Sequence, residues 1–222
     1  MNKMFKRVFD FCFSIFALLL TGWVMCVTAI VIKCTSKGPV IYKAKRVGLD
    51  GQIFTLYKFR SMRVDSGEIK VTTLSTDERI YPFGKFIRKA KIDELPQLFN
   101  IFMGSMSVVG PRPEDVEVAR EYYVGKYEAI CSVKPGLTSP ASLLDYTHGE
   151  MFESEEKYIS EFLPVKLEME LCYVKKQSIF YDIFLIFRTM YIIASKVFGK
   201  KNFKYSKEYY EVIGNIKDKQ TV

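Results

Sequence analysis

The longest feature of the hydrophobic pattern is an apolar run over residues 8–32, interrupted by Asp10 and a few small polar side chains. Its length of about 25 residues is enough for a helix to reach across the hydrocarbon core of a bilayer. A signal peptide is disfavoured because the run is too long and no small-residue cleavage site follows it. A buried helix of a soluble core is the alternative, and the near-absence of charge argues against it. The pattern therefore predicts a membrane-anchoring helix within residues 1–35.

Basic residues flank this apolar run on both sides. They are Lys3, Lys6 and Arg7 before it and Lys33, Lys37, Lys43, Lys45 and Arg46 after it. Because positive residues prefer the cytoplasmic side of a membrane, both ends favour the same face. A re-entrant helix that bends near Thr21 and Gly22 would satisfy both ends, since Gly weakens a helix and Thr can bond back to a preceding carbonyl. A single span with the basic domain inside is the alternative.

A β-hairpin is predicted directly after the anchor. Residues 40–42 and 52–60 have strand-like patterns, and the Asp50-Gly51 step between them favours a tight turn. On the second strand Lys58 and Arg60 would face the same way, with Phe59 opposite. Two cations that project together suit a phosphate, whereas a solvated strand face is the alternative reading.

The rest of the pattern is mainly helical. Helices are predicted over residues 82–91, 93–103, 114–130, 154–176 and 178–198, a polar loop over 63–77, and loop-like structure over 138–150. The helix at 178–198 carries a narrow polar stripe, which favours core packing together with contact at the membrane interface. The fold class predicted is α+β: mainly helical with a small antiparallel β-hairpin, an N-terminal re-entrant membrane helix and interfacial helices. The expected division is a membrane anchor at 1–35, a catalytic domain at 36–200, and a basic segment with a disordered tail at 201–222.

Composition narrows the chemistry. The chain has 222 residues, a formal charge of +8 and 49% hydrophobic residues, which fits one domain plus attachments. The charge favours anionic partners: nucleic acid, anionic lipid or a phosphorylated substrate. Nucleic acid is disfavoured because the cations are not gathered in a recognition helix and no zinc-ligand spacing occurs. The five cysteines have no metal-ligand spacing, and the single histidine, His148, argues against a histidine-based metal site or catalytic triad.

Asp93 and Glu94 are the most informative pair of residues. They follow four cations, Lys85, Arg88, Lys89 and Lys91. Asp93 is predicted to be the N-cap of a helix with Pro96 in its first turn, and a carboxylate at such a position is expected to stay ionised. An ionised carboxylate can be a nucleophile or a Mg²⁺ ligand. An ordinary cap with a surface ion pair is the alternative.

Arg112 is the second candidate site residue. It lies between Pro111 and Pro113, which make the backbone around it stiff and extended. A rigidly presented arginine suits bidentate binding of a phosphate. The alternative is a structural turn with a solvent-facing arginine.

In their order and spacing, these motifs resemble those of the monotopic phosphoglycosyl transferases, the bacterial sugar transferase family of undecaprenyl-phosphate glycosyl-1-phosphate transferases. The likeness extends from residue 6 to about residue 189. The motifs that carry it are KRVFD at 6–10, SKGPV at 36–40, RVG at 46–48, KFRSM at 58–62, DELPQLFN at 93–100 and GSMSVVGPRP at 104–113. A lone Asp-Glu pair would be weak evidence, but the whole ordered set is highly specific.

The resemblance implies an activity: transfer of a sugar phosphate from a UDP-sugar to a membrane polyprenyl (undecaprenyl) phosphate, with release of UMP, at the start of surface-glycan assembly. It implies Mg²⁺ as cofactor, Asp93 as the nucleophile of a covalent phosphosugar intermediate, and Glu94 as an assistant through metal or proton handling. Lys58, Arg60, Arg88 and Arg112 are then expected to contact phosphate. Other implied features are location at the cytoplasmic face of the bacterial inner membrane, contact with membrane lipid, and downstream glycosyltransferases as partners.

The chain departs from the family pattern in two places. Many relatives have Ser-Pro where this chain has Thr21-Gly22. Many also continue after the PGLT motif at 135–138 with Gly-x-Ala-Gln and a later arginine, whereas no Arg or Lys occurs here between Lys134 and Lys157. The altered segment suggests a different sugar or a separate branch of the family. A non-catalytic basic membrane adaptor is the alternative function, although it leaves the ordered set of Asp93, Glu94 and Arg112 unexplained.

Overall fold

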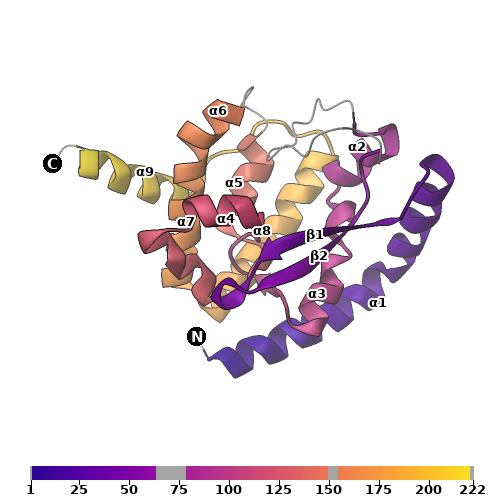
Figure 1. Ribbon diagram of the computed structural model, residues 1–222, viewed down its shortest axis with the longest axis horizontal. Helices are drawn as coiled ribbons and strands as arrows, with labels where there is room; N and C mark the ends of the chain where they lie inside the picture. Colours follow the sequence, from indigo (N-terminus) through magenta and orange to yellow (C-terminus); the bar gives the residue numbers. More distant parts are fainter. Residues whose placement is uncertain (1, 64–78, 150–154, 221–222) are drawn as a thin grey trace.

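The computed structural model describes residues 2–63, 79–149 and 155–220. The polar loop predicted at 63–77 lies almost entirely outside these ranges. Figure 1 shows a mainly helical body with one small hairpin and a long N-terminal helix along one edge. The predicted α+β class is confirmed in these coarse features.

The N-terminal helix α1 covers Lys3–Thr35 and is long and apolar enough to cross a membrane. An 18-residue window of it has a mean hydropathy of 2.5, and only 11% of that window is buried. It remains helical through Thr21 and Gly22, and the Thr21 hydroxyl donates to the carbonyl of Ala17 at 2.7 Å. Figure 1 shows that α1 changes direction along its length before it leads into β1. Whether it re-enters one membrane face or crosses the bilayer stays a prediction.

The KRVFD motif docks the first turns of α1 onto the body. The Arg7 guanidinium donates to the carbonyls of Ile101 and Phe102 at 2.6 and 2.7 Å, near the C-terminal end of α3 (Gln97–Met103), where unpaired carbonyls attract a cation. Asp10 is buried, and its Oδ1 accepts the backbone N–H of Val108 at 3.0 Å. This motif therefore ties the anchor to the body.

The hairpin forms as expected. Strands β1 (Ile41–Val47) and β2 (Ile53–Phe59) pair antiparallel, with Ile41 opposite Phe59 and Val47 opposite Ile53. The turn η1 (Leu49–Gly51) places Asp50 at φ 52° and Gly51 at φ 74°, a backbone region that Asp and Gly tolerate best. The amide of Asn100 fastens β2 to α3 by accepting from Tyr57 N at 3.0 Å and donating to Thr55 O at 2.7 Å. The hairpin is thus held against the helix that follows the Asp-Glu pair.

A second, parallel strand pair was not predicted. β3 (Ser107–Val109) and β4 (Gly136–Thr138) run side by side, with Val109 opposite Thr138. A Cβ on Gly110 or Gly136 would collide with the other segment's backbone, so this approach requires glycine at both positions. Two strands of three residues are too short to produce a recognisable pattern.

The helices agree with the sequence pattern where that pattern is long. The remaining helical elements are α2 (Pro82–Lys89), η2 (Ile92–Glu94), α4 (Val116–Tyr122), η3 (Gly125–Ser132), α5 (Pro140–His148), α6 (Glu155–Lys157), a π-helical turn (Tyr158–Phe162), α7 (Leu163–Lys176), α8 (Ile179–Val197) and α9 (Lys207–Gln220). The predictions at 82–91, 154–176 and 178–198 are confirmed apart from their ends, whereas the one at 114–130 covers two separate elements, α4 and η3.

Three local predictions were wrong. The predicted loop at 138–150 is helix α5, which Ser139 caps by accepting from Ser142 N, with Pro140 in the first turn. The tail predicted to be disordered forms α9, which contacts α7 and buries Val212. Asp93 is not a helix N-cap: it lies in the 3₁₀ turn η2, and α3 begins only at Gln97.

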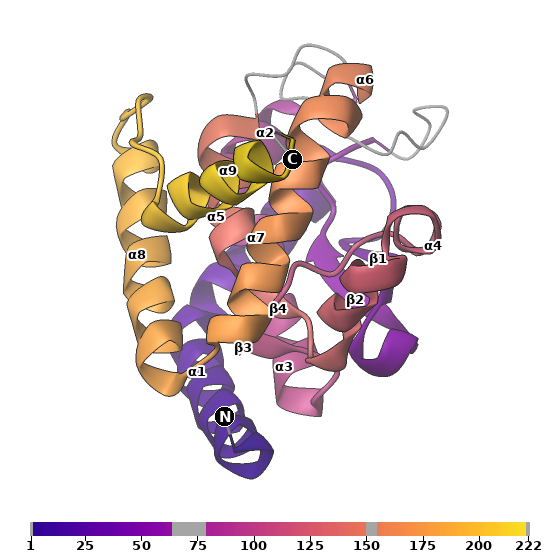
Figure 2. The same cartoon turned by 90° about the vertical axis from the view of Figure 1, so that its left-hand side faces the viewer.

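The main core gathers where α3, α5, α7, α8 and the two strand pairs meet. Its fully buried members include Leu56, Ile101, Met106, Tyr173 and Leu185. Figures 1 and 2 place α5 and α7 within the body, with α8 and α1 along its outside.

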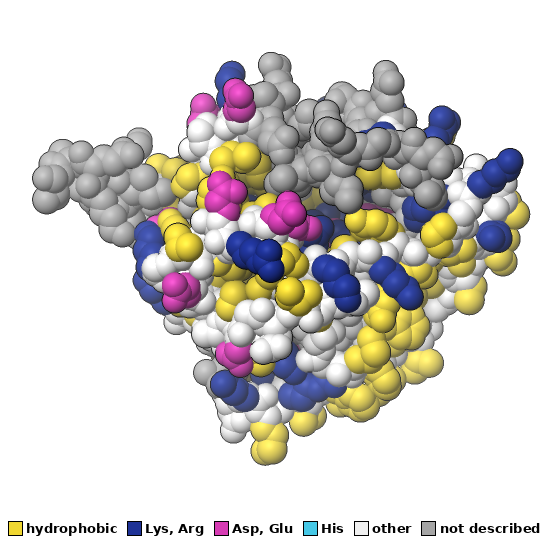
Figure 3. Space-filling view, in the orientation of Figure 1, with side chains coloured by type: hydrophobic (Ala, Val, Ile, Leu, Met, Phe, Trp, Pro, Cys, Tyr) yellow, Lys and Arg dark blue, Asp and Glu magenta, His cyan; other side chains and the backbone are white. Residues whose placement is uncertain are grey.

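The outer helices expose large apolar side chains. Those more than half exposed include Phe16, Leu19, Leu20 and Trp23 on α1 and Phe180, Phe184, Phe187 and Met190 on α8. Figure 3 shows hydrophobic side chains gathered along the edge occupied by α1. Apolar surface of this extent is typical of a protein that contacts a membrane or a partner.

Candidate active site

The Asp-Glu pair lies in the short turn η2, between α2 and α3. Lys91, directly before the turn, has left-handed backbone angles (φ 56°, ψ 19°), which are uncommon for a residue with a side chain. Asp93 and Glu94 are both buried, each with 7% of its surface exposed. The turn therefore places two carboxylates side by side below the surface.

Glu94 is the meeting point of three cations. Its Oε1 lies 3.2 Å from Lys91 Nζ, 3.4 Å from Lys58 Nζ and 3.5 Å from Arg112 Nη2. Burial alone would raise the pKa of Glu94, but the charges of Lys91, Lys58 and Arg112 outweigh it and hold that pKa well below its ordinary value. Glu94 is thus a buried, ionised carboxylate surrounded by positive charge.

Asp93 differs from its neighbour. Burial and the adjacent charge of Glu94 raise the pKa of Asp93, and Lys58, Lys91 and Arg88 only partly oppose this. The direction is opposite to the one expected for a helix cap, because Asp93 lies before the helix and Glu94 takes the close cation contacts. Within the described ranges, Asp93 Oδ1 is buried and has no hydrogen-bond partner. A buried polar atom without a hydrogen-bond partner destabilises the folded state unless a ligand binds to it.

Two of the predicted phosphate-binding residues converge on the pair. Lys58 reaches it from β2, and burial lowers the pKa of Lys58 despite the nearby Glu94. Arg112 reaches it from the segment after β3, and Glu94 together with Asp145 raises its pKa against the effect of burial. Arg88, on α2, influences Asp93 through its charge.

Arg60 is engaged elsewhere. Its guanidinium donates to the carbonyl of Lys37 and, at 2.8 Å, to that of Ser36, so it ties the end of β2 to the chain just after α1. Lys58 and Arg60 therefore have different contacts, although both follow the pattern of one strand face. A phosphate contact by Arg60 stays a prediction.

Two residues of this region were not assigned from sequence. Lys91 was counted among the cations before the pair but given no role, although its spacing of three residues from Glu94 is one at which side chains meet. Tyr146 on α5 lies beneath it, with Lys91 Nζ 4.7 Å from the ring centroid and Lys196 Nζ 4.3 Å from it. No local pattern reveals this contact, because Tyr146 and Lys91 are far apart in sequence.

The residues fit a Mg²⁺ ion only in company with a substrate. No cluster of three or more His, Cys, Asp or Glu side chains suited to a metal occurs in the part of the chain that the structure describes. Mg²⁺ is nevertheless commonly held by one or two carboxylates together with substrate phosphates. Asp93 Oδ1, which has no partner within the described part of the chain, provides such a donor set together with Glu94.

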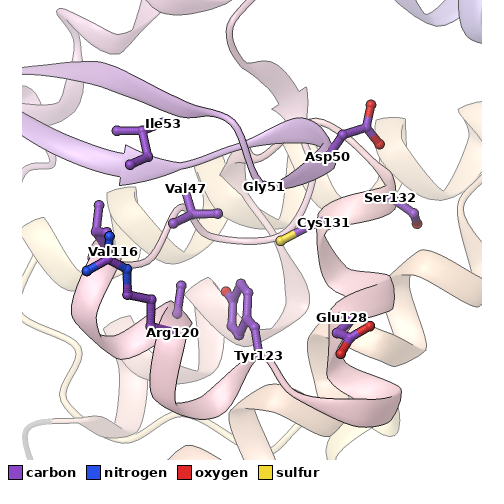
Figure 4. A pocket seen from close by; sticks show the side chains of 11 residues that line it. Val47, Asp50, Gly51, Ile53, Val116, Arg120, Tyr123, Glu128, Cys131 and Ser132 are labelled. Atoms are coloured by element: carbon purple, nitrogen blue, oxygen red, sulfur yellow. The ribbon is translucent and has the colours of Figure 1, made fainter.

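A separate cleft of about 570 Å³ lies at the hairpin tip. Figure 4 shows Tyr123 and Cys131 on one side of it and Val47 and Ile53 on the other. Neither Asp93 nor Glu94 lines this cleft. The buried charged groups around Asp93 and Glu94 therefore lie outside this cleft.

Comparison with known proteins decides the family. The model of the bacterial sugar transferase family matches residues 1–196. The chain belongs to this family. The match includes the apolar helix, the hairpin, the Asp-Glu pair and the Arg112 segment, so the family resemblance inferred from the motifs is confirmed.

Three curated relatives share more than a third of their aligned residues with the chain. A "UDP-glucose:undecaprenyl-phosphate glucose-1-phosphate transferase" of Klebsiella pneumoniae is 38% identical over 194 residues, which are 86% of this chain and 40% of that protein. A "UDP-N-acetylgalactosamine-undecaprenyl-phosphate N-acetylgalactosaminephosphotransferase" of Aeromonas hydrophila is 35% identical over 83% of this chain and 42% of its own length. The "Uncharacterized sugar transferase EpsL" of Bacillus subtilis is 37% identical over 83% of this chain and 85% of its own length.

The chain thus spans about 40% of the length of the Klebsiella and Aeromonas relatives, but most of the Bacillus protein. The names of the first two share the lipid acceptor and differ in the sugar. Together with the exposed apolar face of α1, these likenesses indicate a membrane-associated protein.

Proposed function

We propose that this chain is a phosphoglycosyl transferase that moves a sugar phosphate from a UDP-sugar to a polyprenyl phosphate. The observation that carries the proposal is the buried pair at 93–94. Asp93 has an oxygen without a hydrogen-bond partner among the described residues, and Glu94 holds three cations from three separate segments next to it. The names of the relatives support the donor and acceptor classes. The sugar itself is left open, because the relatives differ in it.

The first step forms a covalent intermediate. A carboxylate oxygen of Asp93 attacks the phosphorus that bears the sugar, and the bond from that phosphorus to the oxygen bridging the two phosphates breaks. UMP departs with the bonding electron pair, and the sugar phosphate is left on Asp93 as an acyl phosphate. In the second step an oxygen of the polyprenyl phosphate attacks the same phosphorus. Asp93 is released as a carboxylate, and the product is a polyprenyl diphosphate sugar, the substrate class for downstream glycosyltransferases.

The cations make this attack feasible. A carboxylate that approaches a diphosphate meets strong negative charge, and Lys58, Lys91 and Arg112 lie where they can offset it. Glu94 keeps these three side chains together and charged before the donor arrives. With Asp93 it would also hold Mg²⁺, which when bound supplies further charge neutralisation at the phosphates.

Membrane association gives access to the lipid acceptor. The exposed apolar side chains of α1 and α8 would lie in the bilayer interface, where the phosphate of a polyprenyl lipid is found. Basic residues at both ends of α1 favour a single side of the membrane, so we place the active site on the cytoplasmic face of the inner membrane, where nucleotide sugars are made available.

The test is UMP release by purified protein in the presence of undecaprenyl phosphate, Mg²⁺ and a panel of UDP-sugars that includes UDP-glucose and UDP-N-acetylgalactosamine. We expect release with at least one donor and its loss in Asp93→Asn. Asp50→Asn is the matched control, because Asn also tolerates the left-handed backbone of the hairpin turn. No release with any donor, despite tight binding to liposomes, would instead support a membrane adaptor.

A further inference from the structure

Glu170 is a buried carboxylate behind the Arg112 segment, on α7, with 1% of its surface exposed. Its Oε1 accepts the backbone N–H of Arg112 at 3.0 Å and the hydroxyl of Ser139 at 3.0 Å. Its Oε2 is buried and has no hydrogen-bond partner in the described part of the chain. One carboxylate oxygen thus joins two segments that follow different strands.

The parallel strand pair explains this meeting. Gly110 N donates to Thr138 O where β3 and β4 end, and Gly136 N donates to Pro111 O, so the chain that follows β3 stays beside β4. Arg112 follows the first strand and Ser139 follows the second. Since parallel strands end at the same edge, a side chain from α7 reaches both segments at once.

The prolines make this hydrogen bond the only one that a backbone N–H of residues 111–113 can donate. Neither Pro111 nor Pro113 has an N–H group, so Arg112 supplies the single amide donor of this three-residue stretch. Glu170 accepts it. The guanidinium of the same residue extends to Glu94 at 3.5 Å. The position of the Arg112 backbone therefore determines where its guanidinium lies relative to Glu94.

Among the residues that the structure describes, Glu170 forms no ion pair. Lys166, one turn earlier on α7, is paired with Glu114 at 2.5 Å. A buried carboxylate held mainly by hydrogen bonds destabilises the fold relative to an apolar side chain of the same size. Its presence here calls for a functional reason, and the Arg112 N–H provides one.

We propose that Glu170 is a positioning residue that holds Arg112 in line with Glu94 and with the donor diphosphate. The inference rests on the proposed function, in which Arg112 contacts phosphate. Glu170 does not touch Asp93 or Glu94, and we assign its effect on turnover to the Arg112 N–H that it accepts.

The test compares three variants in the UMP-release assay, with the donor that supports turnover. Glu170→Met keeps the volume but removes the acceptor, Glu170→Gln keeps an acceptor oxygen, and Glu168→Gln is a control on the partly exposed face of the same helix. We expect Glu170→Met to lower kcat/KM at least tenfold, Glu170→Gln to recover most of that loss, and the control to match the wild type. In an Arg112→Ala background, Glu170→Met should cause no further loss, because the group it positions is absent.

A pH profile gives a second readout. Burial raises the pKa of Glu170 to about 7, although the Arg112 N–H, Lys166 and Ser139 oppose it. The other titratable groups that act on it or feel its charge are Glu114, Tyr123 and Tyr173. The ionised carboxylate is the better acceptor, so the ratio of wild-type to Glu170→Gln kcat/KM should be larger at pH 8 than at pH 6.

Three results would overturn the inference: wild-type kcat/KM in a folded Glu170→Met, losses that multiply in the double variant, or a ratio of wild-type to Glu170→Gln kcat/KM that is equal at both pH values. If Glu170→Met does not fold, the test rests on the ratio of wild-type to Glu170→Gln kcat/KM at pH 8 and pH 6. Failure of the proposed function would look different, since the wild type itself would then release no UMP with any donor.

Discussion

Glu94 and Glu170 are both buried glutamates that contact Arg112, yet they are held in opposite ways. Glu94 meets the guanidinium along with two lysines, and its pKa lies well below the ordinary range. Glu170 meets the backbone N–H of Arg112, and burial raises its pKa to about 7. The two pKa values differ because three cations lie close to Glu94, whereas Lys166, the lysine near Glu170, is paired with Glu114.

Glu94 and Glu170 therefore have different roles at Arg112. Around Glu94, buried charge is matched by charge, so the cations stay assembled and ready to meet a phosphate. Around Glu170, the carboxylate fixes a backbone that two prolines have made stiff, and the fold pays in stability for that bond. Burial alone therefore does not decide whether a carboxylate is charged.

The largest effect should come from removing the charge at Glu94. In Glu94→Gln the three cations lose their common partner, and we expect kcat/KM to fall by about 10²–10³, the usual loss when an electrostatic stabiliser of a transition state is removed. Glu117→Gln, at an exposed position on α4, is the control. A Glu94→Gln enzyme with half or more of wild-type UMP release would show that the cation cluster is not part of catalysis.

The next effect concerns stability at Glu170. Its pKa is about 7 in the folded chain against an ordinary value of 4.5, so the folded state binds the proton more tightly. The stability this contributes is complete below the ordinary value and is lost as the pH rises through 7, by up to ~3 kcal/mol. The melting temperature of the wild type should therefore fall more between pH 5 and pH 8 than that of Glu170→Gln. Equal slopes in the two proteins would contradict the assigned environment.

A smaller effect is expected at Lys91. Lys91→Met keeps the length of the side chain but removes one of the three charges around Glu94, so we expect kcat/KM to fall about tenfold, or about 1.4 kcal/mol. Lys85→Met, at an exposed position on α2, should leave turnover unchanged. Equal activity of the two variants would mean that the contacts of Lys58 and Arg112 suffice.

The sequence revealed those parts of the fold that depend on local signals. The Asp50-Gly51 step predicted the hairpin, and length with apolar periodicity predicted α1, α7 and α8. Helix α5 was not predicted, although Ser139 and Pro140 form a recognisable helix start. Strands β3 and β4 could not be seen, since three residues are too few for a pattern.

The candidate site follows the same division. Asp93, Glu94 and Arg112 stand out in the sequence because rigid or charged neighbours surround them. The partners that determine their state are distant in the chain: Glu170 is 58 residues from Arg112, and Lys58 is 36 residues from Glu94. The raised pKa of Asp93 was not predicted for a related reason, because burial of this turn follows from packing that no local pattern encodes.

Trapping the intermediate tests the role of Asp93 most directly. Purified protein with Mg²⁺ and a UDP-sugar that supports turnover, but without polyprenyl phosphate, should release one equivalent of UMP and gain the mass of one sugar phosphate. Peptide mapping by mass spectrometry should place that mass on Asp93, and Asp93→Asn should gain none. UMP release without a mass gain on the protein, or a sugar phosphate attached to a different residue, would contradict the covalent role of Asp93.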